Sequence, residues 1–197
     1  MSKTENTSKL NGRDLINIGI YSAIYFVIVM VFAMTGLIPI MLMLLSSMVA
    51  VFGGIPFMLF LTKVKKPGMI FIMSVIMGIL MFVTGMTWMP IVVSVITGII
   101  SEIIYKSGNY QSISKAVLTC GVFPLWAFGN YLPLFLQRDQ YFADRTEYGQ
   151  EYADAVMKLT PNWMIIVLLV LTFVCGIVGG LIGKKLLKKH FEKAGIV

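Results

Sequence analysis

Long apolar stretches separated by short polar segments make up most of the chain. We predict six membrane-spanning helices, at about residues 14–34, 38–61, 68–84, 89–105, 114–136 and 161–187. Each is about 17 residues or longer, the range in which an apolar helix can cross the hydrocarbon core of a bilayer. The pattern therefore predicts an all-α membrane protein built as a six-helix bundle.

The polar segments set the expected domain limits. We predict a mobile cytoplasmic arm at residues 1–12, a transmembrane domain at residues 13–190 and a cytoplasmic tail at residues 191–197. The longest polar connection, residues 137–160, predicts a loop or a short surface helix. Its acidic residues either repel anionic ligands or are simply solvated, and the sequence leaves both open.

Composition supports the membrane assignment and excludes several functions. The chain is 58% hydrophobic and 13% charged, with a mean hydropathy of +0.87, so it is no ordinary soluble domain. It has no nucleotide-binding loop, no zinc-binding histidine pair and no Ser/His/Asp set. Its only histidine, His190, lies in the Lys-rich tail. We expect no enzyme, no cofactor and no metal.

The distribution of Lys and Arg predicts the orientation. Cytoplasmic loops carry an excess of these residues, and with both termini inside the cytoplasmic segments hold 13 of the 16. Only Arg138, Arg145 and Lys158 then face outward. We expect a multi-pass protein of a prokaryotic plasma membrane, whose net charge of +7 reflects orientation rather than nucleic-acid binding.

One apolar segment, GVFPLWAFGNYLPLFL at residues 121–136, carries polar and helix-disturbing residues. On a helix, Trp126, Asn130 and Pro133 lie at positions i, i+4 and i+7, on one side. Polar groups and prolines at membrane depth need partners from neighbouring helices or a ligand. The segment predicts a pocket wall that includes Tyr131, although Asn130 bonded to a neighbouring helix, with Trp126 as packing, explains it too.

Further aromatic and polar residues are expected in the same outward half. Trp88 marks the outer start of the fourth span, and Asn162 and Trp163 that of the sixth. Tryptophan at a membrane boundary is often only an anchor. The predicted substrate-binding residues are Trp88, Trp126, Asn130, Tyr131, Asn162 and Trp163.

Two intramembrane patterns point to packing or partner contacts. Glu102 and Lys106 are one turn apart and predict an interfacial ion pair, in preference to a proton relay. Gly19 and Ala23, with Ser22 beside them, form a small-xxx-small pattern that lets another helix approach. The glycines of the last span, at 176, 180 and 183, offer a similar surface or serve internal packing.

The chain resembles the substrate-binding S subunits of energy-coupling factor (ECF) transporters, and within them the Trep_Strep-type membrane proteins. The likeness extends from Asn11 onward. It rests on NGRDLINIGIYSAIYF, GGIPFMLFLTKVKKPGM, GIISEIIYKSGNY and GGLIGKKLLKKHFEKAGI, in that order.

This resemblance implies a six-helix subunit that captures a small organic, vitamin-like micronutrient from outside. It implies as partners a transmembrane coupling protein and two cytoplasmic ATPases, with Gly19, Ser22 and Ala23 at the coupling contact. Gly19 stands where family members usually carry alanine. It also implies a pocket near Trp88, Trp126, Asn130 and Trp163. A small membrane scaffold that binds no ligand is the alternative.

The predicted topology can be tested by cysteine labelling. Single reporter cysteines at Ser8 and Glu147 should react differently with an impermeant reagent in intact cells, because only residue 147 is expected outside. Labelling at position 8 would contradict the orientation.

Overall fold

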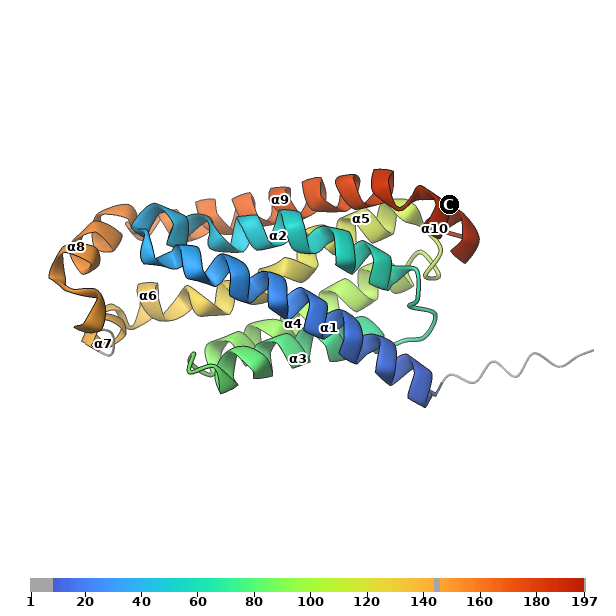
Figure 1. Ribbon diagram of the computed structural model, residues 1–197, viewed down its shortest axis with the longest axis horizontal. Helices are drawn as coiled ribbons and strands as arrows, with labels where there is room; N and C mark the ends of the chain where they lie inside the picture. The colour runs from blue at the N-terminus through green and yellow to red at the C-terminus, as the bar shows by residue number, and fades with distance from the viewer. Residues whose placement is uncertain (1–8, 144–145, 197) are drawn as a thin grey trace, which may run out of the picture.

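The structure is an elongated bundle of helices. The computed structural model describes residues 9–143 and 146–196, and no strand occurs among them. The short helices α7 (Arg138–Ala143) and α8 (Gln150–Leu159) lie at one end of the bundle, and α10 (Lys188–Ala194) lies at the other (Figure 1). We call these the α8 end and the α10 end.

Four of the described helices are long and apolar enough to cross a membrane. They are α1 (Gly12–Ala33) with its 3₁₀ extension η1 (Met34–Leu37), α2 (Pro39–Leu61), α4 (Met89–Lys106) and α9 (Met164–Leu186). The apolar helix α3 (Met69–Val83) is shorter. The all-helical membrane architecture is therefore supported, whereas the count of six spans and their orientation stay predictions.

The segment predicted as a continuous span over residues 114–136 is broken in the structure. It consists of α5 (Ile113–Val122), the 3₁₀ helix η2 (Phe123–Asn130) and α6 (Leu132–Leu136). Pro124 and Pro133 stand in the first turns of η2 and α6, where the absent N–H of proline costs least. An eight-residue 3₁₀ helix is unusually long, since such runs rarely exceed 3–4 residues.

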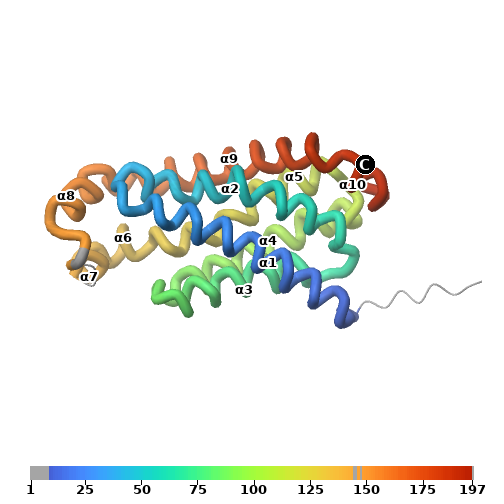
Figure 2. The backbone as a smooth tube through the Cα atoms, viewed as in Figure 1, coloured from blue at the N-terminus to red at the C-terminus, as the bar shows by residue number. Residues whose placement is uncertain are grey.

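Close packing on α4 supports the broken segment. A Cβ on Gly129 would lie 2.4 Å from Pro90 Cα and 2.7 Å from Pro90 N. Irregular backbone at membrane depth is tolerated where protein surrounds it, and Phe123, Trp126 and Phe128 of η2 are all buried. Figure 2 shows the same segment running inside the bundle, behind α1 and α2.

The glycines of α9 serve internal packing. A Cβ on Gly179 would lie 2.5 Å from Ala50 O of α2, and one on Gly176 would lie 2.5 Å from Cys120 O of α5. Helices in lipid associate through such close backbone contacts, because no hydrophobic force distinguishes a neighbouring helix from lipid. The sequence had left open whether these glycines face a partner, and they face α2 and α5.

Sulfur and aromatic side chains fill the centre of the bundle. Met69, Met73 and Met77 form a buried stripe along α3 at helical spacing. The rings of Phe57 and Phe123 stack with centroids 4.0 Å apart, and the ring of Tyr25 meets Phe123 edge-on at 5.4 Å. These contacts fix the start of η2 against α1 and α2.

Glu102 makes contacts different from those predicted. Its carboxylate accepts hydrogen bonds from the backbone N–H groups of Ile70 and Phe71, at 3.1 and 3.3 Å, and from the Tyr110 hydroxyl at 2.9 Å. Burial raises the pKa of the Tyr110 hydroxyl, and the neighbouring Glu102 carboxylate raises this pKa further. The hydroxyl therefore stays protonated and donates its hydrogen bond to Glu102. No ion pair joins Glu102 to Lys106 among the described residues. A carboxylate at the N-terminus of α3 accepts hydrogen bonds from N–H groups that have no partner within the helix, and its negative charge interacts favourably with the positive end of the helix dipole.

The start of α1 is tied down at the α10 end. Asn11 and Asp14 form a reciprocal capping box, and Asp14 also pairs with Lys66 at 2.7 Å. Asn11 therefore belongs to the folded part, although it falls within the predicted mobile arm. Most of that arm, residues 1–8, lies outside the described residues.

Adding one methyl group to the α2–α9 contact should destabilise the bundle. Gly179→Ala places a Cβ against two backbone carbonyls of α2, and overpacking of this kind costs roughly 1–3 kcal/mol. Gly19→Ala is the matched control, because nothing lies within 4 Å of a Cβ there. Thermal unfolding in detergent measures both variants, and equal midpoints would contradict this packing.

Candidate ligand-binding cavity

A cavity of about 300 Å³ lies toward the α8 end of the bundle. The last turns of α1, η1 and the first half of α2 form one wall. The turn after α3, η2 and the cap region from α7 to α8 form the rest. The volume is at the lower end of the range of about 300–1,000 Å³ typical of small-molecule pockets. Its lining includes Met30, Ala33, Leu45, Val49, Met81, Thr84, Met86 and Ala127.

The 3₁₀ helix η2 contributes a tryptophan and an amide to the cavity wall. Trp126 is fully buried, and its ring meets Tyr25 edge-on at 6.4 Å. Asn130 Nδ2 donates to Ala127 O at 3.1 Å, and a flipped amide would set two acceptors against each other. Asn130 Oδ1 is buried and has no hydrogen-bond partner in the described structure. Such an acceptor is costly to bury unless something bonds it.

Tyr131 uses its hydroxyl to hold the wall in place. Its Oη accepts from Ser46 N at 3.1 Å and donates to Leu42 O at 2.9 Å. These bonds join the junction of η2 and α6 to α2. Tyr131 thus lines the cavity while its hydroxyl is already bonded to α2.

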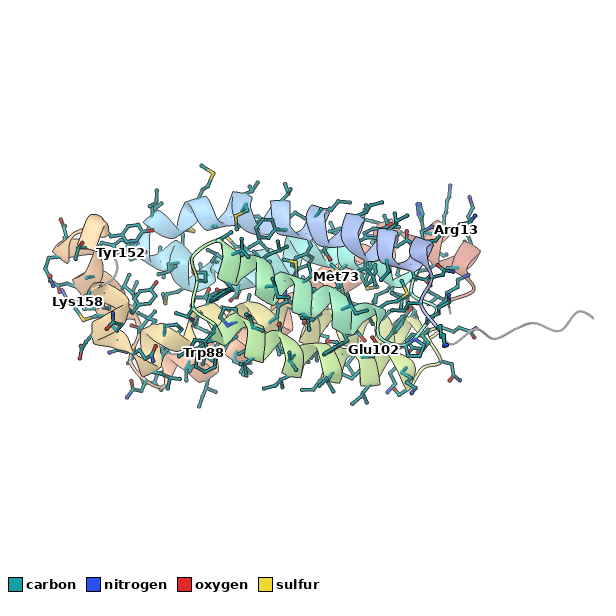
Figure 3. The ribbon with its side chains drawn as sticks, turned by 90° about the horizontal axis from the view of Figure 1, so that it is seen from below. Arg13, Met73, Trp88, Glu102, Tyr152 and Lys158 are labelled. Atoms are coloured by element: carbon teal, nitrogen blue, oxygen red, sulfur yellow. The ribbon has the colours of Figure 1, made fainter. Side chains whose placement is uncertain are left out.

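The cap region closes the cavity with further tyrosines. Tyr141, Tyr148 and Tyr152 line it from α7, the 3₁₀ helix η3 (Thr146–Tyr148) and α8. Tyr152 Oη donates to Gly36 O at 2.6 Å, and the Tyr148 and Tyr152 rings stack at 5.1 Å. Figure 3 shows Tyr152 at this end, near the labelled Lys158. The segment 137–160, predicted as a polar loop or short surface helix, therefore contributes directly to the cavity.

A second set of contacts holds the cap on the bundle. Val156 of α8 is fully buried, within a cluster that includes Met43, Phe128 and Leu168. Arg138 donates to Thr160 O at 2.6 Å and closes the segment on itself. The sequence carries a signal for this arrangement, because Tyr152, Val156 and Leu159 recur at helical spacing. These tyrosines were not among the predicted site residues.

The structure brings together some predicted site residues and leaves others outside. Trp126, Asn130 and Tyr131 line the cavity. Trp88 is 59% exposed and Trp163 is 61% exposed, and Asn162 is exposed as well. Figure 3 labels Trp88 at the turn before α4. The three exposed residues suit a bilayer boundary, where tryptophan is enriched.

The predicted coupling residues on α1 point in two directions. Gly19 and Ala23 are exposed, and a Cβ on Gly19 would meet nothing within 4 Å. Ser22 faces inward at 2% exposure. Large apolar side chains flank the exposed pair, among them Ile16, Ile20 and Val27. An apolar face with a small-residue seam is compatible with lipid or with a partner helix.

The cavity can hold an apolar or aromatic molecule without the cost of an unpaired charge. None of the described residues that line it is charged. Over the described ranges, 9–143 and 146–196, no three His, Cys, Asp or Glu side chains gather as metal ligands would. Its chemistry is aromatic faces, aliphatic and methionine side chains, and a few hydroxyl and amide groups.

The long apolar helices and the exposed apolar faces define the class as a polytopic helical membrane protein. Within this class, the chain belongs to the family described as hypothetical bacterial integral membrane protein (Trep_Strep), whose model matches residues 12–193. No curated protein and no solved structure matches the chain.

Proposed function

We propose that this protein is the substrate-binding membrane subunit of an ATP-driven importer of the ECF type. In this proposal the α8 end faces outward, and the cavity captures a small organic, vitamin-like molecule. The observation that carries the proposal is the cavity of about 300 Å³, whose wall is a buried 3₁₀ segment with Trp126 and the unpartnered Asn130 oxygen. Structural packing alone would favour a regular, apolar helix here.

The lining chemistry narrows the proposed ligand. Burying a charge without a partner is far more costly than burying a polar group, and the described lining offers no charged partner. The enclosed part of the ligand is therefore uncharged. Aromatic walls suit a planar ring, because offset and edge contacts between rings add to simple burial.

The proposed partners are a transmembrane coupling protein and two cytoplasmic ATPases. A subunit that only binds cannot concentrate its ligand, so the energy must come from a docked module. The exposed pair Gly19 and Ala23 supports α1 as the docking helix, because small residues allow close approach of a second helix. The glycines of α9 are used within the bundle, which favours α1 further.

A membrane scaffold that binds no ligand is the competing function. The two functions differ in whether the cavity holds a small molecule. Purified protein should carry a small molecule that denaturation releases and mass spectrometry identifies. A scaffold would release none.

Binding should depend on the Asn130 amide. Asn130→Ala should weaken binding of the compound that co-purifies by roughly 1–3 kcal/mol, the cost of losing a buried hydrogen bond. Asn162→Ala is the matched control, because it removes the same amide at an exposed position outside the cavity. Isothermal titration calorimetry on folded protein gives both affinities. Equal affinities would assign Asn130 to packing.

Transport should depend on the small-residue seam of α1. Ala23→Leu adds bulk to the exposed face while the distant cavity stays intact, so ligand binding should persist and uptake with the complete module should fail. Val178→Leu on α9, also exposed, controls for added bulk in the membrane. Normal assembly and uptake by Ala23→Leu protein would exclude this seam as the coupling contact.

A further inference from the structure

The α10 end of the bundle contains a second hollow. Basic side chains line it, whereas no charged side chain of the described residues lines the cavity. The volume of the hollow is about 240 Å³, and Lys63, Lys65, His190 and Lys193 line it together with the polar side chains of Asn17 and Thr62. The basic groups come from two segments more than 120 residues apart, the turn after α2 and helix α10. Folding thus concentrates positive charge at one place.

No carboxylate balances this charge among the described residues. Asp14 pairs with Lys66 at 2.7 Å, and Glu192 pairs with Lys188 at 3.8 Å. Glu102 accepts hydrogen bonds from the N-terminus of α3 and from Tyr110. Each described acid at this end is bonded elsewhere. Like charges that converge without a counter-charge repel one another, so the arrangement favours an anion from outside the chain.

Buried contacts anchor helix α10, which contributes His190 and Lys193 to the lining of the hollow. Phe191 is 3% exposed and Ile196 is 6% exposed, and both belong to the central core. Gly195 takes a left-handed conformation at φ 73°, which lets Ile196 N donate back to Phe191 O at 3.0 Å. His190, which the sequence places in the Lys-rich tail, therefore lies on an anchored helix.

We propose that this hollow binds a phosphate group. Lysine ammonium groups donate charge-assisted hydrogen bonds to phosphate oxygens, and the Asn17 amide adds an uncharged donor. The site lies level with the second turn of α1, at the boundary of the proposed span. Two sources fit this chemistry: the headgroup of an anionic phospholipid and free phosphate. The proposal is independent of the ligand in the cavity.

The test is stabilisation of purified protein in neutral detergent. Its thermal unfolding midpoint is followed during titration with dioleoylphosphatidylglycerol, dioleoylphosphatidylcholine or inorganic phosphate, because a ligand that binds only the folded state raises that midpoint. The pocket variant is Lys63→Gln/Lys193→Gln. The control is Lys184→Gln/Lys185→Gln, which removes the same charge from exposed positions outside the hollow.

We expect phosphatidylglycerol to stabilise the protein, with a half-maximal concentration about tenfold higher in the pocket variant, from the loss of charge-assisted bonds. The control should match the unaltered protein. Stabilisation by phosphatidylglycerol alone identifies a lipid headgroup, and stabilisation by inorganic phosphate with the same lysine dependence identifies free phosphate. Equal weakening in the control, equal stabilisation by phosphatidylcholine, or no stabilisation by any probe would overturn the site.

Discussion

The close approach of α2 and α9 is the contact on which the positions of the other helices depend. Gly54 and Gly179 let the two backbones meet, and van der Waals contact of this kind drives association where lipid is as apolar as the protein. A neighbouring face of α9 meets α5 through Gly176. Since η2 follows α5 directly, its place beside the cavity is set by glycines on another helix.

The long elements could be predicted from the sequence because their signal is local. Runs of apolar residues give α1, α2, α4 and α9 to within a few residues. The break in the fifth segment was foreseeable only as a disturbance, because Pro124 and Pro133 mark where N–H groups are missing without specifying a 3₁₀ path. Glu102 shows a second limit. An i, i+4 lysine is an obvious partner on one helix, whereas capping of α3 depends on tertiary packing.

The part of the candidate site in which polar residues interrupt an apolar run could be predicted from the sequence. The rest of the site could not. Trp126, Asn130 and Tyr131 stood out because membrane depth makes such residues conspicuous. Trp88 and Trp163 stand out in the sequence in the same way, yet both are exposed. A role as anchors at the bilayer boundary explains their positions. The cap tyrosines were missed for the opposite reason. Their acidic surroundings suggest exposure to water, although Tyr152 bonds to Gly36 and lines the cavity.

Helix α1 connects the features that these proposals use. Its last turns line the cavity through Met30 and Ala33, its middle exposes Ala23, and Asn17 near its start lines the basic hollow. Coupling between distant sites can be carried by a rigid element with two discrete arrangements. Both ends of α1 are tied by specific bonds, Asp14 to Lys66 and, through η1, Gly36 to Tyr152.

A partner helix that displaced α1 would have to break these bonds or move their partners as well. Movement of Gly36 would pull on Tyr152 and hence on the cap over the cavity. Movement of Asp14 would release Lys66, which follows the hollow-lining Lys65 in the chain. If the proposed partner docks on α1, these two bonds would link the docking contact to the cap over the cavity and to the start of α1 at the α10 end.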